Sequence, residues 1–75
     1  MEFKEFAKTF AEALDLDNPR KLKESTKFRE LDEWSSLSAL NLIATIDEQL
    51  GFTFEEQDIK NSETVGDLFI IFSKH

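Results

Sequence analysis

The stretch SSLSALNLIATIDEQLGFTF, residues 35–54, begins with two adjacent serines and continues as a long apolar run that ends at a glycine. Serine is a preferred helix N-cap, and a glycine after such a run commonly ends a helix in the left-handed conformation. The pattern therefore predicts a helix that begins at Ser36 or Leu37 and runs to Leu50, with Gly51 as its stop. One cap suffices, so the other hydroxyl of the pair is left for chemistry.

Apolar residues cover more than half of this predicted helix, which indicates that it packs on two sides. They are Leu37, Ala39, Leu40, Leu42, Ile43, Ala44, Ile46 and Leu50. The polar edge that remains must face water or a partner. It consists of Ser38, Asn41, Thr45, Glu48 and Gln49, with Asp47 nearby.

An amphipathic first helix is predicted over residues 3–14, where phenylalanine and alanine recur at three- and four-residue spacing. Pro19, with the Asp and Asn residues before it, should stop this helix. Residues 15–35 then form a long connection. Isolated apolar residues should pin this connection across the protein, namely Leu16, Leu22, Phe28, Leu31 and Trp34.

Two capping boxes predict the remaining helices. The first, Thr53 to Glu56, should open a short helix that reaches about Lys60, and the second, Thr64 to Asp67, should open the last helix. The expected fold is therefore all-α, a small four-helix bundle in a single domain spanning residues 1–75, with three longer helices, a short third helix and a long loop between the first two. Its core should join phenylalanines of the first helix to later side chains: Phe3, Phe6 and Phe10 against Leu40, Ile43 and Phe69.

Composition excludes several classes of function. The 75 residues contain 16 acidic and 9 basic side chains, and the net charge of -7 disfavours nucleic acid and anionic membrane surfaces while favouring basic partners. With no cysteine and a single histidine, the chain offers neither a metal site nor a nucleophile, base and orienting group for catalysis. The charged N-terminus does not resemble a signal peptide, and no segment reaches membrane-spanning length. We expect a cytoplasmic monomer that is not an enzyme.

The quoted stretch, followed by DIKNSETVGDL at residues 58–68, resembles the acyl carrier protein family. That family has an Asp-Ser-Leu triplet opening a long helix, a helix end of the form acidic-acidic-x-apolar-Gly-apolar-x-apolar, and a Thr-Val-Gly-Asp stretch opening its last helix. In this register Ser36 aligns with the serine that accepts 4'-phosphopantetheine, and Ser35 aligns with the preceding aspartate. An anionic phosphodiester at Ser36 would also lie at the positive end of the helix dipole.

The resemblance implies a carrier of acyl thioesters in fatty acid synthesis or in a specialised lipid or polyketide-type pathway. Its partners would be a phosphopantetheinyl transferase and acyl-loading, condensing and acyl-transfer enzymes with basic docking surfaces. The residues implied in docking are Ser35, Leu37, Asn41, Asp47 and Glu48.

The chain departs from the family pattern at several positions. Ser35 lacks the negative charge of the usual aspartate, Trp34 is larger than usual, and Asn41 and Gln49 stand where acidic residues are common. The long loop is locally basic, through Arg20, Lys21, Lys23, Lys27 and Arg29. These departures favour a carrier dedicated to one pathway, and they leave open a helical adaptor that keeps the fold and is not modified.

Overall fold

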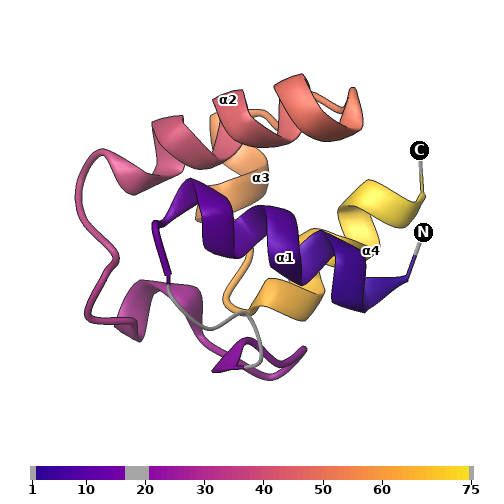
Figure 1. Ribbon diagram of the computed structural model, residues 1–75. Helices are drawn as coiled ribbons and strands as arrows, with labels where there is room; N and C mark the ends of the chain where they lie inside the picture. The colour runs from indigo at the N-terminus through magenta and orange to yellow at the C-terminus, as the bar shows by residue number, and fades with distance from the viewer. Residues whose placement is uncertain (1, 17–20, 75) are drawn as a thin grey trace.

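The computed structural model describes residues 2–16 and 21–74. Within these ranges four α-helices and one short 3-10 helix form, and no strand does. Their bounds are α1 Phe3–Ala13, η2 Phe28–Glu30, α2 Ser38–Leu50, α3 Glu56–Lys60 and α4 Val65–Ser73. The all-α prediction is confirmed, as are the long loop after α1 and the short third helix. Figure 1 shows α1 crossing beneath α2, with the start of α1 and the end of α4 on the same side of the protein.

Helix α1 ends through its own backbone. Asp15 adopts the left-handed conformation with φ of 57°, and the Leu16 N–H donates to the Ala11 carbonyl at 2.8 Å while the Asp15 N–H donates to Glu12. This is the Schellman arrangement, which asparagine or aspartate enters more readily than most residues. The helix therefore stops before the predicted breaker Pro19, which lies outside the described residues.

The core consists largely of phenylalanine rings. Phe6 is fully buried, and its ring centroid lies 6.4 Å from that of Phe54, 5.4 Å from that of Phe69 and 5.4 Å from that of Phe72. Tilted and edge-on contacts of this kind stabilise aromatic pairs beyond the burial of their area. Through Phe6, helix α1 thereby packs against the segment before α3 and against α4.

The prediction that Leu40 packs in the core against the first helix is wrong. Its side chain is 55% exposed, and α2 instead buries Leu42 and Ile46 completely, with Ile43 partly buried against the core. The predicted contact of the first helix with Phe69 is confirmed, since Phe3 and Phe6 both pack against that ring.

The long loop is anchored as predicted. Leu22 and Phe28 are buried, and Leu16, Leu31 and Trp34 pack against the core from partly exposed positions. The Phe28 ring contacts Phe10 of α1 and Trp34, with centroids 6.1 Å and 5.0 Å apart. The loop is thus a fixed part of the fold between α1 and α2.

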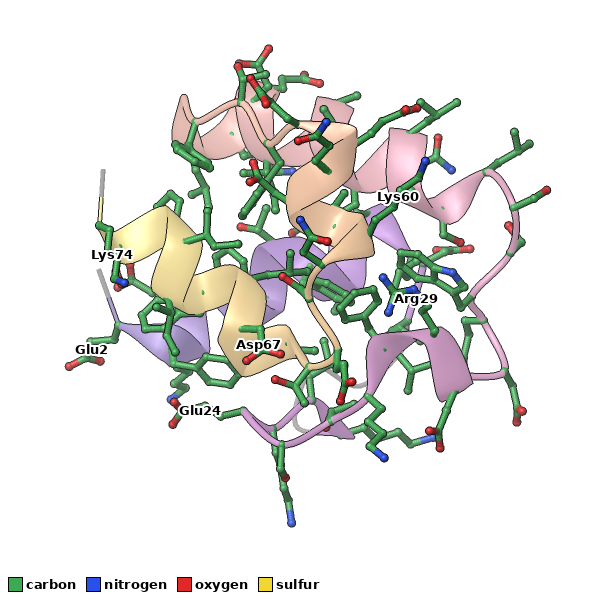
Figure 2. The ribbon with its side chains drawn as sticks, turned by 180° about the vertical axis from the view of Figure 1, so that it is seen from behind. Glu2, Glu24, Arg29, Lys60, Asp67 and Lys74 are labelled. Carbon is green, nitrogen blue, oxygen red and sulfur yellow. The ribbon has the colours of Figure 1, made fainter. Side chains whose placement is uncertain are left out.

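Backbone hydrogen bonds join the loop to the start of α4. The Val65 N–H donates to the Thr26 carbonyl and the Gly66 N–H donates to the Glu24 carbonyl, each at 2.9 Å. A Cβ at Gly66 would lie 2.7 Å from that Glu24 oxygen, so only glycine permits this close approach. Figure 2 shows Glu24 on the loop segment that lies beside the start of α4.

The predicted capping box at Thr53 is wrong. Helix α3 begins at Glu56, and the Glu55 N–H donates to the Asp58 side chain at 3.0 Å, so the box begins two residues later than expected. The Thr53 hydroxyl instead donates to the Asp47 carboxylate of α2 at 2.9 Å. That tertiary hydrogen bond occupies the side chain that the local pattern assigned to a cap.

The predicted box at Thr64 is confirmed. The Asp67 N–H donates to the Thr64 hydroxyl at 3.1 Å, and the Thr64 and Glu63 N–H groups both donate to the Asp67 carboxylate, at 3.1 Å and 2.9 Å. These hydrogen bonds from the Glu63 and Thr64 backbone hold the pKa of Asp67 below its ordinary value, because they favour the ionised form.

Replacing Phe6 by alanine should lower the free energy of unfolding by about 3 to 5 kcal/mol, because a fully buried ring is lost from the core. Leu40→Ala is the matched control, and it should cost less than about 1 kcal/mol because its side chain is exposed. Chemical denaturation measures both changes. Equal losses for the two variants would contradict the described orientation of α1 and α2.

Asp67 should make stability depend on pH in the acid range. A carboxylate whose pKa is lowered by folding stabilises the folded state above its unfolded pKa of about 3.9, and this contribution is lost as the pH falls through the lower folded value. The stability difference between the protein and Asp67→Asn should therefore be constant near neutral pH and shrink in acid. A difference that stays flat on acidification, measured by denaturation at a series of pH values, would rule this out.

Candidate functional site

The paired serines lie in a turn that leads into α2. The Ser38 N–H donates to the Ser35 carbonyl at 3.1 Å, and the Ser35 N–H donates to the Ser38 hydroxyl at 2.8 Å. The two hydroxyl oxygens of Ser35 and Ser38 lie 3.3 Å apart, and the Leu37 N–H reaches the Ser35 hydroxyl at 3.4 Å. Ser35 and Ser38 thus satisfy polar groups at the helix entrance reciprocally, much as a capping box does.

Helix α2 begins at Ser38, one or two residues after the predicted start. Residues 36 and 37 lie in the turn, and Leu37 precedes the helix without a side-chain cap. The later start follows from the hydrogen bond between the Ser38 N–H and the Ser35 carbonyl, which closes a turn over Ser36 and Leu37. The predicted end at Leu50 is confirmed, with Gly51 in the left-handed conformation at φ of 71°.

Ser36 is the serine of this turn whose hydroxyl is not used by the fold. Its side chain is exposed, and it forms no hydrogen bond to any residue in the described ranges 2–16 and 21–74. Trp34, two residues earlier, is fixed against the Phe28 ring, and Ser38, two residues later, is buried. The Ser36 hydroxyl is therefore presented to solvent on a short turn that is anchored at both ends.

Ser36 also lies two residues before the first residue of α2. The first N–H groups of a helix lack intrahelical partners, and the positive end of the helix dipole favours a negative group there. An exposed hydroxyl with no internal partner, placed beside such donors, suits attachment of a phosphodiester. The residues present therefore fit a phosphopantetheine group at this serine.

The outward face of α2 differs from the predicted polar edge. Ser38 is buried and Thr45 is half-buried, so these two do not face solvent as expected. The other four predicted polar residues, Asn41, Asp47, Glu48 and Gln49, are exposed as expected. They share the outward surface with the exposed apolar residues Leu37, Leu40 and Ala44. The expectation that this helix packs on two sides is wrong, because Leu40 and Ala44 of α2, and Leu37 just before it, are exposed on this outward face.

All five residues implied in docking lie at the surface. Ser35, Leu37 and Asn41 are exposed near the start of α2, and Asp47 and Glu48 are exposed near its end. Asp47 also accepts the hydrogen bond from Thr53. The structure therefore divides these residues between the two ends of one helix, with Ser36 at the uncharged end.

Arg29 has a structural role that sequence reasoning missed. Its guanidinium donates to the carbonyl oxygens of Ile59 at the end of α3, of Lys60 at 3.0 Å and of Ser62 at 2.8 Å. Figure 2 shows Arg29 beside this end of α3, close to Lys60. The side chain satisfies carbonyls that the last turn of a helix leaves without partners, and it adds a positive charge at the negative end of the dipole.

Fewer of the basic side chains of the long loop are therefore available to a partner than its sequence indicates. Arg29 is committed to α3, and Lys27 forms an exposed ion pair with Glu30 at 3.9 Å. Arg20 lies outside the described residues, which leaves Lys21 and Lys23 as exposed cations of the described loop. No local signal marks Arg29, because its partners lie about thirty residues further along the chain.

Across residues 2–16 and 21–74, no group of three or more His, Cys, Asp or Glu side chains is placed to hold a metal ion. No helix in these ranges has the length and apolar character needed to cross a membrane.

Comparison with known families assigns the chain. The family model described as the phosphopantetheine attachment site matches residues 4–69, which include the turn at Ser36, all of α2 and α3 and the first turn of α4. No solved structure matches the chain at a significant level. The chain therefore belongs to the phosphopantetheine attachment family, as its resemblance to acyl carrier proteins implied, and its prosthetic group is 4'-phosphopantetheine.

Proposed function

We propose that Ser36 is the attachment residue and that the chain is an acyl carrier protein. The single observation that supports this best is the contrast among the three serines at the entrance of α2. Ser35 and Ser38 are bonded to each other and to the backbone, whereas the Ser36 hydroxyl is exposed and unbonded among the described residues. The residue that the family register assigns to modification is also the one that the fold does not need.

The prosthetic group supplies, when bound, a thiol on a flexible arm that holds an acyl group as a thioester. The chain itself contains no cysteine, so it offers no thiol that could exchange with such a thioester. Its role is to hold the acyl group at high effective concentration beside whichever enzyme has docked. The carrier does no catalysis in this proposal.

The partners fit the acidic balance of the chain. A transferase adds the arm, and acyl-loading, condensing and acyl-transfer enzymes use it in turn. Asp47 and Glu48 offer negative charge at the far end of α2 from Ser36, and charges of this kind govern encounter rate and partner choice more than affinity. We further propose that the chain acts as a monomeric single domain in the cytoplasm, in fatty acid synthesis or a specialised lipid or polyketide-type pathway.

The adaptor that is never modified is the competing function, and the uncharged Ser35 favours it because the family places an aspartate there. Intact-mass measurement separates the two. After incubation with a phosphopantetheinyl transferase and coenzyme A, the carrier should gain one phosphopantetheine adduct, located on Ser36 by peptide mapping. Protein that stays wholly unmodified, both after this treatment and when purified from its own host, would support the adaptor.

Ser36→Ala should abolish the adduct without a measurable change in the free energy of unfolding, because its side chain makes no bond in the described fold. Ser35→Ala is the matched control and should still be modified. Finding the arm on Ser35, or an undiminished adduct on the Ser36 variant, would overturn the assignment.

Alanine substitutions of Ser38 and Ser35 should lower the free energy of unfolding by different amounts. Ser38→Ala removes a buried hydroxyl that accepts from the Ser35 N–H at 2.8 Å, and it should cost about 1 to 2 kcal/mol. Ser35→Ala removes the longer and more exposed contacts, so it should cost about 0.5 kcal/mol. Urea denaturation of the two variants checks this order, and a larger loss for Ser35 would show that Ser35 is the principal cap.

A further inference from the structure

Trp34 is held in place two residues before Ser36. Its backbone N–H donates to the Leu31 carbonyl at 3.0 Å, and the hydrogen-bonded turn that contains Ser36 follows directly. Its indole lies against the fully buried Phe28 ring, with centroids 5.0 Å apart. At about 3.8 Å per residue, the Cα atoms of Trp34 and Ser36 lie at most about 7.6 Å apart. The indole is therefore a fixed group beside the hydroxyl assigned to modification.

Part of this indole remains at the surface. The Trp34 side chain is half-buried, so its contact with Phe28 leaves some of the ring exposed to solvent. The indole N–H forms no hydrogen bond to any residue in the ranges 2–16 and 21–74. Among the half-buried and buried residues that the structure describes, no enclosed side-chain nitrogen or oxygen lacks a partner, so this unbonded nitrogen is accessible to solvent. Trp34 thus presents both apolar ring surface and a free donor.

The other side chains near the modified hydroxyl offer no comparable donor. Asp32 and Glu33 are exposed carboxylates, which only accept hydrogen bonds when ionised and repel an anion. The Ser35 and Ser38 hydroxyl oxygens lie 3.3 Å apart and are used by the turn. The indole N–H is therefore the side-chain donor of this segment, apart from the hydroxyl to be modified, that the described fold leaves unused.

We propose that Trp34 binds the root of the 4'-phosphopantetheine arm, with its ring packed against the pantoyl methyl groups and its N–H donating to the phosphate. The inference rests on the proposed function, because it requires the arm to be on Ser36. In the arm, one methylene separates the phosphate ester oxygen from a carbon that carries two methyl groups. An anionic acceptor and a compact apolar group thus lie next to each other, which suits a side chain with an apolar body and a polar N–H.

The contact restricts the arm near its attachment and leaves the thiol end free. Packing of methyl groups against an aromatic ring is favoured by the hydrophobic effect, and a hydrogen bond to a charged acceptor is stronger than one between neutral groups. Covalent attachment also makes the contact intramolecular, so that a weak contact is populated by its high effective concentration. Trp34 is thus a positioning residue that fixes the direction in which the arm leaves Ser36.

Trp34 can report on this contact itself, because the chain contains one tryptophan and no tyrosine. The full chain is compared with its arm-bearing form, made with a phosphopantetheinyl transferase and coenzyme A. Quenching of tryptophan fluorescence by acrylamide measures access to the indole. Attachment should lower the quenching constant about twofold or more, because the arm covers the exposed part of the ring. Free pantetheine at the same concentration should leave the constant of the unmodified protein unchanged.

Nuclear magnetic resonance tests the two halves of the contact separately. Nuclear Overhauser effects should connect the indole ring protons of Trp34 with the pantoyl methyl protons in the arm-bearing protein. The indole N–H proton should shift downfield on attachment, because a charged phosphate accepts its hydrogen bond.

The matched control moves the tryptophan to another exposed position. Trp34→Phe is combined with Ile70→Trp, which retains an aromatic ring next to Phe28 and places the reporter on α4, where Ile70 is 50% exposed. Figure 1 shows α4 across the protein from the start of α2. The quenching constant of this variant should not change on attachment of the arm. Melting temperatures establish that the variant is folded.

The possible outcomes separate the two proposals. If Ser36 carries the arm and either the quenching constant of Trp34 is unchanged or no Overhauser effect reaches the pantoyl methyl groups, the contact is refuted while the carrier function stands. An equal loss of quenching for the reporters at positions 34 and 70 refutes the contact as well, because the shielding is then nonspecific. If no adduct forms at all, the proposed function is refuted, and the contact with it.

Discussion

Packing of phenylalanine rings around α1 is the interaction on which the rest of the structure depends. A chain of this size without cysteine must obtain its stability from its core. Phe6 contacts rings before α3 and within α4, and Phe10 contacts Phe28 in the long loop. Since Phe28 also contacts Trp34, one continuous series of rings extends from the middle of α1 to the residue before the paired serines.

That series explains how an exposed hydroxyl can be held in a defined place. Trp34 is fixed by Phe28, the Ser35 to Ser38 turn follows at once, and Leu42 fixes the next turn of α2 in the core. The loop that carries Phe28 is itself held by the Arg29 guanidinium at the end of α3 and by the close approach of Glu24 to Gly66. Glu24, Phe28, Arg29 and Trp34 of this loop thus connect the serine turn to α1, α3 and α4.

Sequence reasoning predicted the helices, the buried loop residues and the cap at Thr64, because each depends on nearby residues. It failed where contacts between residues far apart in the sequence determine which side chain caps a helix, is buried or forms a hydrogen bond. Thr53 and Glu55 each begin a plausible cap, and the hydrogen bond from Thr53 to Asp47 selects the second. Leu40 and Leu42 are the same residue type in one apolar run, so periodicity alone did not show which faces solvent. The role of Arg29 had no local signal, since its partners are set by the folded arrangement of η2 and α3.

The charged residues of α2, Asp47 and Glu48, lie near its C-terminal end. The net charge of -7 creates a field that can attract basic proteins before contact. At physiological ionic strength that field decays over about 8 Å, which is shorter than the distance of about 15 Å between Leu37 and Asp47. Ser36 therefore lies beyond the effective reach of the acidic end of its own helix. The exposed carboxylates nearest to Ser36 along the chain are instead those of Asp32 and Glu33, in the segment that leads into the serine turn.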